Sequence, residues 1–224
     1  YDSVDPGQAI WQLMSISDIY LSTGEFRQSD EALQQSIALA AKASNNIALG
    51  SALQASAFLY GLTGEFDKGL SNSDSAIAIF RRSGNLLRLG NTYNSRGVLL
   101  AAMGEYNEAI HAYLYADSLY KDEQLPDERG TIANNIGVTY LDQYDYVHAL
   151  AYFQTAVSYL KKGVQDEQYL LYQGNIAECL QRLQKTREAE ELILKTLPLA
   201  KQKNLNRVAS GMSIVMGRVY LDEE

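Results

Sequence analysis

Residues 131–155, TIANNIGVTYLDQYDYVHALAYFQT, contain the pattern that decides the fold of this 224-residue chain. Gly137 stands three residues before Tyr140, and Ala149 stands four residues before Phe153. Side chains three and four positions apart share one face of a helix. The stretch therefore predicts two amphipathic helices joined by a tight turn, which we name the A helix and the B helix.

The same pattern recurs at a step of 40 residues along the whole chain. Positions in step with Gly137 are all small: Ser17, Ala57, Gly97, Gly137, Ala177 and Gly217. Positions in step with Tyr140 are all large: Tyr20, Tyr60, Leu100, Tyr140, Leu180 and Tyr220. An unbroken register of this kind is typical of a solenoid, in which each repeat contacts only its neighbours.

The turn between the two helices repeats as well, as TGEF at 23–26 and 63–66 and as MGEY at 103–106. Glycine just past a helix end adopts the left-handed conformation that closes the last turn, and the acidic residue favours the start of the next helix. The fourth and fifth copies have Tyr144 and Gln184 near this place. Because both lack the glycine, we expect these two turns to close differently.

This pattern resembles the tetratricopeptide repeat family, whose motif has a small residue and a Tyr in helix A and two alanines in helix B. The usual period is about 34 residues, so the step of 40 resembles the longer-helix variant of bacterial regulatory and sensor proteins. The sequence departs from the family where a Trp is usual early in helix A, at Leu13, Leu53, Tyr93, Ala133 and Gln173. The resemblance implies a scaffold that binds proteins or peptides.

We therefore predict an all-α, TPR-like α-solenoid of five helix-turn-helix repeats plus an extra C-terminal helix, forming a single superhelical domain over residues 1–224. The predicted repeats cover about residues 6–44, 45–84, 85–124, 125–163 and 164–203, and the terminal helix covers 204–221. Pro198 lies inside the last B helix. Because proline lacks a backbone donor, we expect it to kink that helix or to end it early.

The terminal helix has an apolar face, formed by Met212, Val215, Met216 and Val219. Solenoid ends normally carry a polar outer face. We therefore expect the chain to be a fragment of a longer protein and to form a homo-oligomer through this helix.

Charge and composition disfavour several classes of partner. The net charge of −8 and the pI near 4.9 disfavour nucleic acid and anionic membrane surfaces, both of which need a basic protein face. No run of residues approaches the roughly 20 apolar residues of a membrane span. Cys179 is the single cysteine and is interpreted as a packed small side chain. The sequence leaves the compartment open: it favours the cytoplasm slightly, and the periplasm is the alternative if a leader was removed.

No motif for catalysis or cofactor binding is present in the sequence. We find no nucleophile motif, phosphate-binding loop or metal-ligand spacing, and His111 and His148 fall on predicted B helices as surface residues. The sequence therefore predicts neither an enzyme nor a cofactor or metal site.

The faces of the A helices opposite the small residues are predicted to line a groove that binds a protein or peptide. Asparagine is a poor helix former because its amide competes for backbone groups, yet that amide offers both donors and an acceptor to a ligand. The predicted peptide-binding residues are Gln54, Phe58, Asn91, Asn94, Val98, Asn134, Val138 and Asn175.

Three alternatives to this interpretation stay open at the level of the sequence. The amides could simply bridge neighbouring helices. The repeats could serve self-assembly or spacing, with no ligand in the groove. The chain could also be the regulatory part of an enzyme whose chemistry lies in flanking segments.

Overall fold

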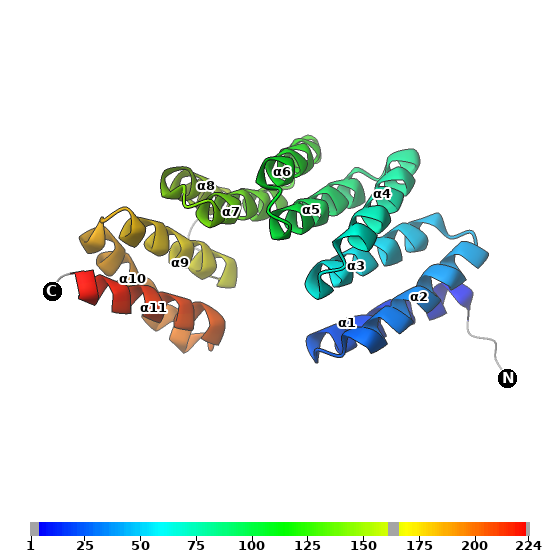
Figure 1. Ribbon diagram of the computed structural model, residues 1–224, viewed down its shortest axis with the longest axis horizontal. Helices are drawn as coiled ribbons and strands as arrows, with labels where there is room; N and C mark the ends of the chain where they lie inside the picture. Colours follow the sequence, from blue (N-terminus) through cyan, green and yellow to red (C-terminus); the bar gives the residue numbers. More distant parts are fainter. Residues whose placement is uncertain (1–4, 161–165, 223–224) are drawn as a thin grey trace. The chain divides into compact units, whose positions relative to one another are not determined.

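The computed structural model describes residues 5–160 and 166–222, and within them it contains eleven helices and no strand (Figure 1). The predicted all-α fold of helical hairpins is therefore confirmed. In chain order the helices are α1 (Pro6–Ser22), α2 (Phe26–Lys42), α3 (Asn46–Thr63), α4 (Phe66–Ser83), α5 (Leu86–Ala102), α6 (Tyr106–Asp122), α7 (Pro126–Asp142), α8 (Tyr146–Tyr159), α9 (Glu167–Arg182), α10 (Thr186–Gln202) and α11 (Asn206–Asp222). Odd-numbered helices are the A helices and even-numbered helices are the B helices.

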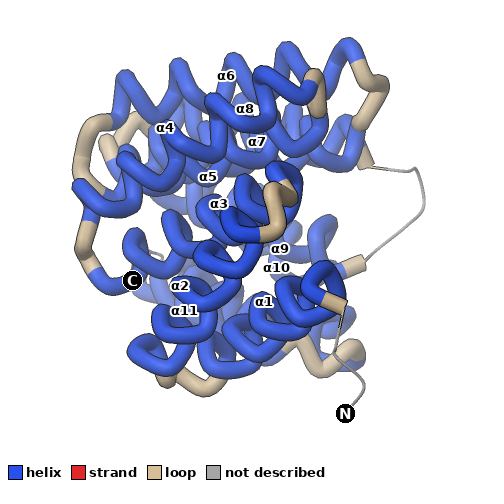
Figure 2. The backbone as a smooth tube through the Cα atoms, turned by 90° about the vertical axis from the view of Figure 1, so that its right-hand side faces the viewer, coloured by secondary structure: helices blue, strands red, loops and turns tan. Residues whose placement is uncertain are grey.

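The 40-residue step of the sequence is also the step of the helices. The A helices α1, α3, α5, α7 and α11 begin at Pro6, Asn46, Leu86, Pro126 and Asn206, and α9 begins one residue out of step. Apart from the connection between α8 and α9, loops of only two or three residues separate one helix from the next, and Figure 2 draws these loops in tan. The predicted boundary between the fourth and fifth repeats, at residues 163 and 164, lies outside the described residues.

The chain divides into two compact units, Tyr1–Glu123 and Gln124–Glu224. We call them unit 1, which contains α1–α6, and unit 2, which contains α7–α11. Within the described residues, no helix is long and apolar enough to cross a membrane.

Two of the small residues of the A helices, Gly97 and Gly137, each pack against a large residue of the following B helix. In unit 1 a Cβ built on Gly97 would stand 2.5 Å from Cε1 of Tyr113, and in unit 2 a Cβ built on Gly137 would stand 2.7 Å from Phe153. Tyr113 and Phe153 are almost fully buried. At Gly97 and Gly137, therefore, the small series of the sequence marks the places where a ring of the following B helix packs against the A helix.

All the turns within hairpins close in the same way, with or without glycine. Gly24, Gly64 and Gly104 have φ between 78° and 84°, and Tyr144 and Gln184 have φ of 62° and 59°. The prediction that the last two turns differ is wrong. The hydrogen bonds that close these turns join backbone atoms only, so a side chain does not prevent them. An L-residue pays a strain of roughly 1–2 kcal/mol there.

The helix that contains Pro198 does not end early, so that part of the prediction is wrong. Helix α10 continues to Gln202, with Ile193 and Ala200 buried on either side of the proline. Pro198 itself is exposed, and the carbonyl that loses its donor belongs to Leu194, which is 57% exposed. Water can therefore bond the freed carbonyl while the buried side of the helix stays packed.

The apolar face of α11 is buried inside unit 2. Met212 and Val215 are 1% and 4% exposed and share a core with Leu170 of α9 and Ile193 of α10. Met216 and Val219 are buried as well. The sequence reasoning treated this face as free for association, which is wrong, because α9 and α10 already cover it.

Candidate functional site

In unit 1 the predicted site residues lie on the A helices α3 and α5, where Gln54 spans the two. The Nε2 atom of Gln54 lies 3.5 Å from Oγ of Ser95, and its Oε1 atom accepts from Oγ1 of Thr92 at 3.4 Å. Both distances are long for hydrogen bonds. Gln54 is half-buried, so its amide is only loosely engaged by its neighbours.

Arg88 at the start of α5 is held by a hydroxyl of α3 and by aromatic rings of α1 and α4. Its NH1 donates to Oγ of Ser51 at 2.6 Å, and its guanidinium carbon lies 5.8 Å from the ring centre of Trp11 and 5.9 Å from that of Phe80. Rings at this distance attract a cation through their π face. A positive charge is therefore fixed beside Ser51 in an acidic chain.

The remaining predicted residues of unit 1 differ in how accessible they are. The amide oxygen of Asn91 accepts from the hydroxyl of Tyr120 at 2.6 Å, and Asn94 is half-buried and has a partner. Phe58 and Val98, in contrast, are 45% and 41% exposed. Unit 1 thus exposes two apolar side chains at the same position of successive A helices. The amides close to them in sequence already interact with neighbouring residues.

In unit 2 two of the predicted amides bind each other. The Nδ2 atom of Asn175 on α9 donates to Oδ1 of Asn134 on α7 at 2.8 Å. Asn134 is only 8% exposed, against the expectation that it lies open on its helix face, whereas Val138 is 36% exposed. The alternative interpretation, in which amides bridge neighbouring A helices, describes this pair.

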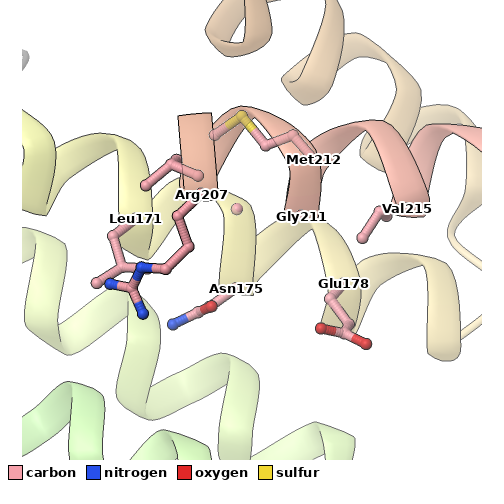
Figure 3. A pocket seen from close by; sticks show the side chains of 9 residues that line it. Leu171, Asn175, Glu178, Arg207, Gly211, Met212 and Val215 are labelled. Carbon is pink, nitrogen blue, oxygen red and sulfur yellow. The ribbon is translucent and has the colours of Figure 1, made fainter. Parts of the chain in front are cut away.

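A pocket of unit 2 opens between α9 and α11, beside Asn175 (Figure 3). Its cavity volume is about 110 Å³. It is lined by Leu171, Gly174, Asn175, Glu178, Arg207, Val208, Gly211, Met212 and Val215. In Figure 3 Arg207 lies beside Leu171 at one end, and Glu178 lies toward the other.

Of the two charged residues that line this pocket, Glu178 lies close to groups of opposite charge and Arg207 does not. Oε1 of Glu178 lies 3.0 Å from NH1 of Arg218 and 3.9 Å from NH2 of Arg182. Arg207 forms no ion pair with any residue that the structure describes. The carboxylate is therefore matched, while the guanidinium stays available.

The sequence reasoning missed the contribution of α11 to this pocket. It placed Asn175 on the site but not Arg207, Gly211 or Met212, because it treated α11 only as an end helix. A signal was present, since glycine inside a helix costs roughly 0.5–1 kcal/mol relative to alanine, and both Gly174 and Gly211 lie in helix interiors.

The side chains described here offer a ligand hydrogen bonds, charge and apolar surface. Burial, with the nearby Glu178 charge, raises the pKa of the Cys179 thiol to about 12, so the nucleophilic thiolate is scarce at neutral pH. Among residues 5–160 and 166–222, no group of three or more His, Cys, Asp or Glu side chains could hold a metal ion. Hydrogen bonds, the Arg207 charge and apolar contact are the means by which these helices can hold a ligand.

The helical hairpins, the 40-residue step and the small-to-large packing define a helical-repeat protein. Two stretches, residues 13–42 and 129–164, match models of the tetratricopeptide repeat. The chain therefore contains tetratricopeptide repeats in these two stretches. A search of curated proteins found no match.

Solved structures with the same fold include proteins from distant sources. A Signal Transduction ATPase with Numerous Domains from Pyrococcus horikoshii, with a tetratricopeptide repeat sensor, superposes with a TM-score of 0.82 at 15% identity, over 95% of this chain and 32% of that one. BtubC from P. vanneervenii superposes with a TM-score of 0.75 at 17% identity, over 89% of this chain and 84% of that one.

A third solved structure holds a peptide. NprR in complex with its cognate peptide NprX superposes with a TM-score of 0.71 at 18% identity, over 100% of this chain and 65% of that one. Its apo form is described as a quorum sensor from B. thuringiensis. At these identities the likenesses establish the fold alone.

Proposed function

We propose that this chain binds an extended segment of a partner protein or peptide along the exposed faces of its A helices. The observation that carries the proposal is the register of its exposed apolar residues. In unit 1, Phe58 and Val98 are 45% and 41% exposed and stand 40 residues apart, and in unit 2, taken by itself, Val138 holds the same position of its A helix and is 36% exposed. An extended segment offers side chains and backbone polar groups at regular intervals, which the exposed apolar residues of the A helices and the loosely engaged amide of Gln54 complement.

Two of the structural relatives support this proposal by what they do. NprR has been solved with a bound peptide, and the Pyrococcus horikoshii protein uses its tetratricopeptide repeats as a sensor. We extend the proposal accordingly: the chain is the sensor or scaffold part of a larger signalling protein.

The test compares apolar residues of equal exposure on an A helix and on a B helix. Phe58 on α3 and Leu114 on α6 are both 45% exposed in unit 1. Fluorescence polarisation would measure binding of labelled seven-residue peptides, randomised at each position, to the Phe58→Ser, Leu114→Ser and parent proteins. We expect Phe58→Ser to weaken binding about tenfold, as loss of a buried apolar contact does, and Leu114→Ser to leave it unchanged.

Thermal unfolding of both variants serves as the control for folding. The two serine substitutions should change the unfolding temperature to a similar, small extent, since both side chains are half in water. Equal binding by the two variants, or no binding of any peptide by the parent protein, contradicts the proposed function.

A further inference from the structure

The pocket between α9 and α11 exists because two side chains are missing from the repeat. In step with Gly174, the A helices α3, α5 and α7 carry the amides Gln54, Asn94 and Asn134. In step with Gly211, the other A helices carry Trp11, Ser51, Asn91, Thr131 and Leu171. Glycine thus stands in unit 2 at two facing places where every other copy has a side chain.

The space beside the two glycines is not filled by neighbouring side chains. A Cβ built on Gly211 would have no atom within 4 Å, and one built on Gly174 would meet only Met212, at 3.6 Å. The floor of the pocket is formed by Val208, Met212 and Val215, which are buried. Its volume of about 110 Å³ is somewhat below the roughly 150 Å³ of an apolar cavity that holds benzene, and it therefore fits one aliphatic side chain.

The charged residues at the mouth of the pocket favour a ligand with a negative charge. The carboxylate of Glu178 is matched by Arg218 and Arg182, at 3.0 and 3.9 Å. The exposed guanidinium of Arg207 has no anionic partner among the described residues. A guanidinium in this position selects a carboxylate, which it can bind through two parallel hydrogen bonds.

We infer that this pocket is the anchor site for one aliphatic side chain of the bound segment, with Arg207 binding a carboxylate next to it. The inference rests on the proposed function and names the kind of segment that the chain selects. The carboxylate comes either from an adjacent acidic residue or from the end of the segment, and the probes below distinguish these two sources.

Four pools of labelled six-residue peptides serve as probes, each randomised outside the positions named. The first pool has an internal Leu-Asp pair and an amidated end, and the second ends in Leu with a free carboxylate. The third has Leu-Asn and an amidated end, and the fourth has Gly-Asp and an amidated end. Fluorescence polarisation measures the affinity of each pool for the whole chain. We expect the first or the second pool to bind about tenfold more tightly than the third and fourth, and the tighter of the two identifies the carboxylate.

Two sets of variants connect this preference to the pocket. Arg207→Gln should remove the preference for a carboxylate while leaving the preference for leucine over glycine. The double variant Gly174→Ala and Gly211→Ala adds two methyl groups to the cavity and should weaken binding of the leucine pools about tenfold. The same double variant should raise the unfolding temperature, because alanine favours a helix over glycine.

Gly217→Ala provides the matched control for the filled pocket. Gly217 also lies in α11, also has no atom within 4 Å of its built Cβ, and does not line the pocket. It should raise stability without changing the affinity of any pool.

The outcomes separate the inference from the proposed function. Equal binding of all four pools, with no effect of the pocket variants, overturns the inference while the proposed function stands. A filled pocket that weakens binding no more than Gly217→Ala does also overturns it. Failure of every pool to bind overturns both.

Discussion

The turn at Gln184 offers a direct test of how the hairpins close. Gln184 has a φ of 59°, and the residue 120 positions earlier, Gly64, has a φ of 78°. The two turns share their closing bond, since Lys185 N donates to Leu180 O at 2.9 Å and Glu65 N donates to Tyr60 O at 2.8 Å. We predict that Gln184→Gly stabilises the protein and that the reverse change, Gly64→Gln, destabilises it.

The size of the effect follows from backbone conformation alone. No atom lies within 4 Å of a Cβ built on Gly64, so contacts do not contribute there. An L-residue in the left-handed region costs roughly 1–2 kcal/mol. Glycine avoids this strain, but it raises the conformational entropy of the unfolded chain, which offsets roughly 0.5–1 kcal/mol of the gain. The net change in the free energy of unfolding is therefore about 0.5–1 kcal/mol, equal to a shift of about 2 °C in Tm for a chain of this length.

Urea unfolding followed by far-UV circular dichroism measures the change, and hydrogen exchange of the α9 and α10 amides locates it. Because helical repeats do not always unfold in one step, exchange in α9 and α10 should slow for Gln184→Gly. Gly64→Gln should instead speed exchange in α3 and α4. Stability changes of the same sign for the two variants would refute the reasoning.

Three further predictions test the packing described above. Gly137→Ala should lower stability by about 1–3 kcal/mol, since its Cβ would stand 2.7 Å from Phe153, whereas Gly217→Ala should raise it by about 1 kcal/mol; thermal unfolding compares them. Asn175→Ala should cost about 1–3 kcal/mol by leaving the buried Asn134 amide unpaired, and a double-mutant cycle in urea with Asn134→Ala should show that removing both costs less than the sum of the two. The Cys179 thiol, with its pKa raised to about 12, should resist a disulfide reagent at neutral pH until the protein is unfolded, so rapid labelling of the folded protein would contradict its burial. Because that pKa lies above the ordinary value of about 8.5, the stability contributed by the buried neutral thiol should be lost as the pH rises from about 8.5 toward 12.

The register of the sequence was enough to predict the helical hairpins, and it marked the positions where small residues are required. A small residue at Gly97 or Gly137 is informative because a ring presses directly on its Cα, so nothing larger fits. Hydrophobic periodicity reports this kind of constraint well, since it depends on which face of a helix is buried and not on its partner.

Side-chain pairing between helices could not be predicted in the same way. Asn134 of α7 and Asn175 of α9 stand 41 residues apart in the sequence, yet they hydrogen-bond each other. A residue on the face opposite its own B helix can therefore still be buried by the A helix that follows. The pocket beside Asn175 escaped the sequence for the same reason, since α11 forms one of its walls.

The turns at Tyr144 and Gln184 and the helix α10 around Pro198 tolerate residues that are locally unfavourable there. Tyr144 and Gln184 accept a strained backbone because the surrounding helices are packed, and Pro198 is tolerated because it faces water. Each exception costs about as much as one good contact, which the many contacts of a packed repeat can absorb.

The way helices contact one another has a mechanical consequence. Within each unit the substantial contacts join helices that are one or two places apart in the chain, such as α1 with α2, α2 with α3 and α1 with α3. A force that pulls on one end therefore meets one hairpin at a time and never the whole core. Under an optical trap, each unit should extend in successive steps, each releasing about 130–145 Å of stretched chain per 40 residues. Such a chain lengthens as its hairpins unfold one after another, and it shortens as they refold in the reverse order when the force is removed.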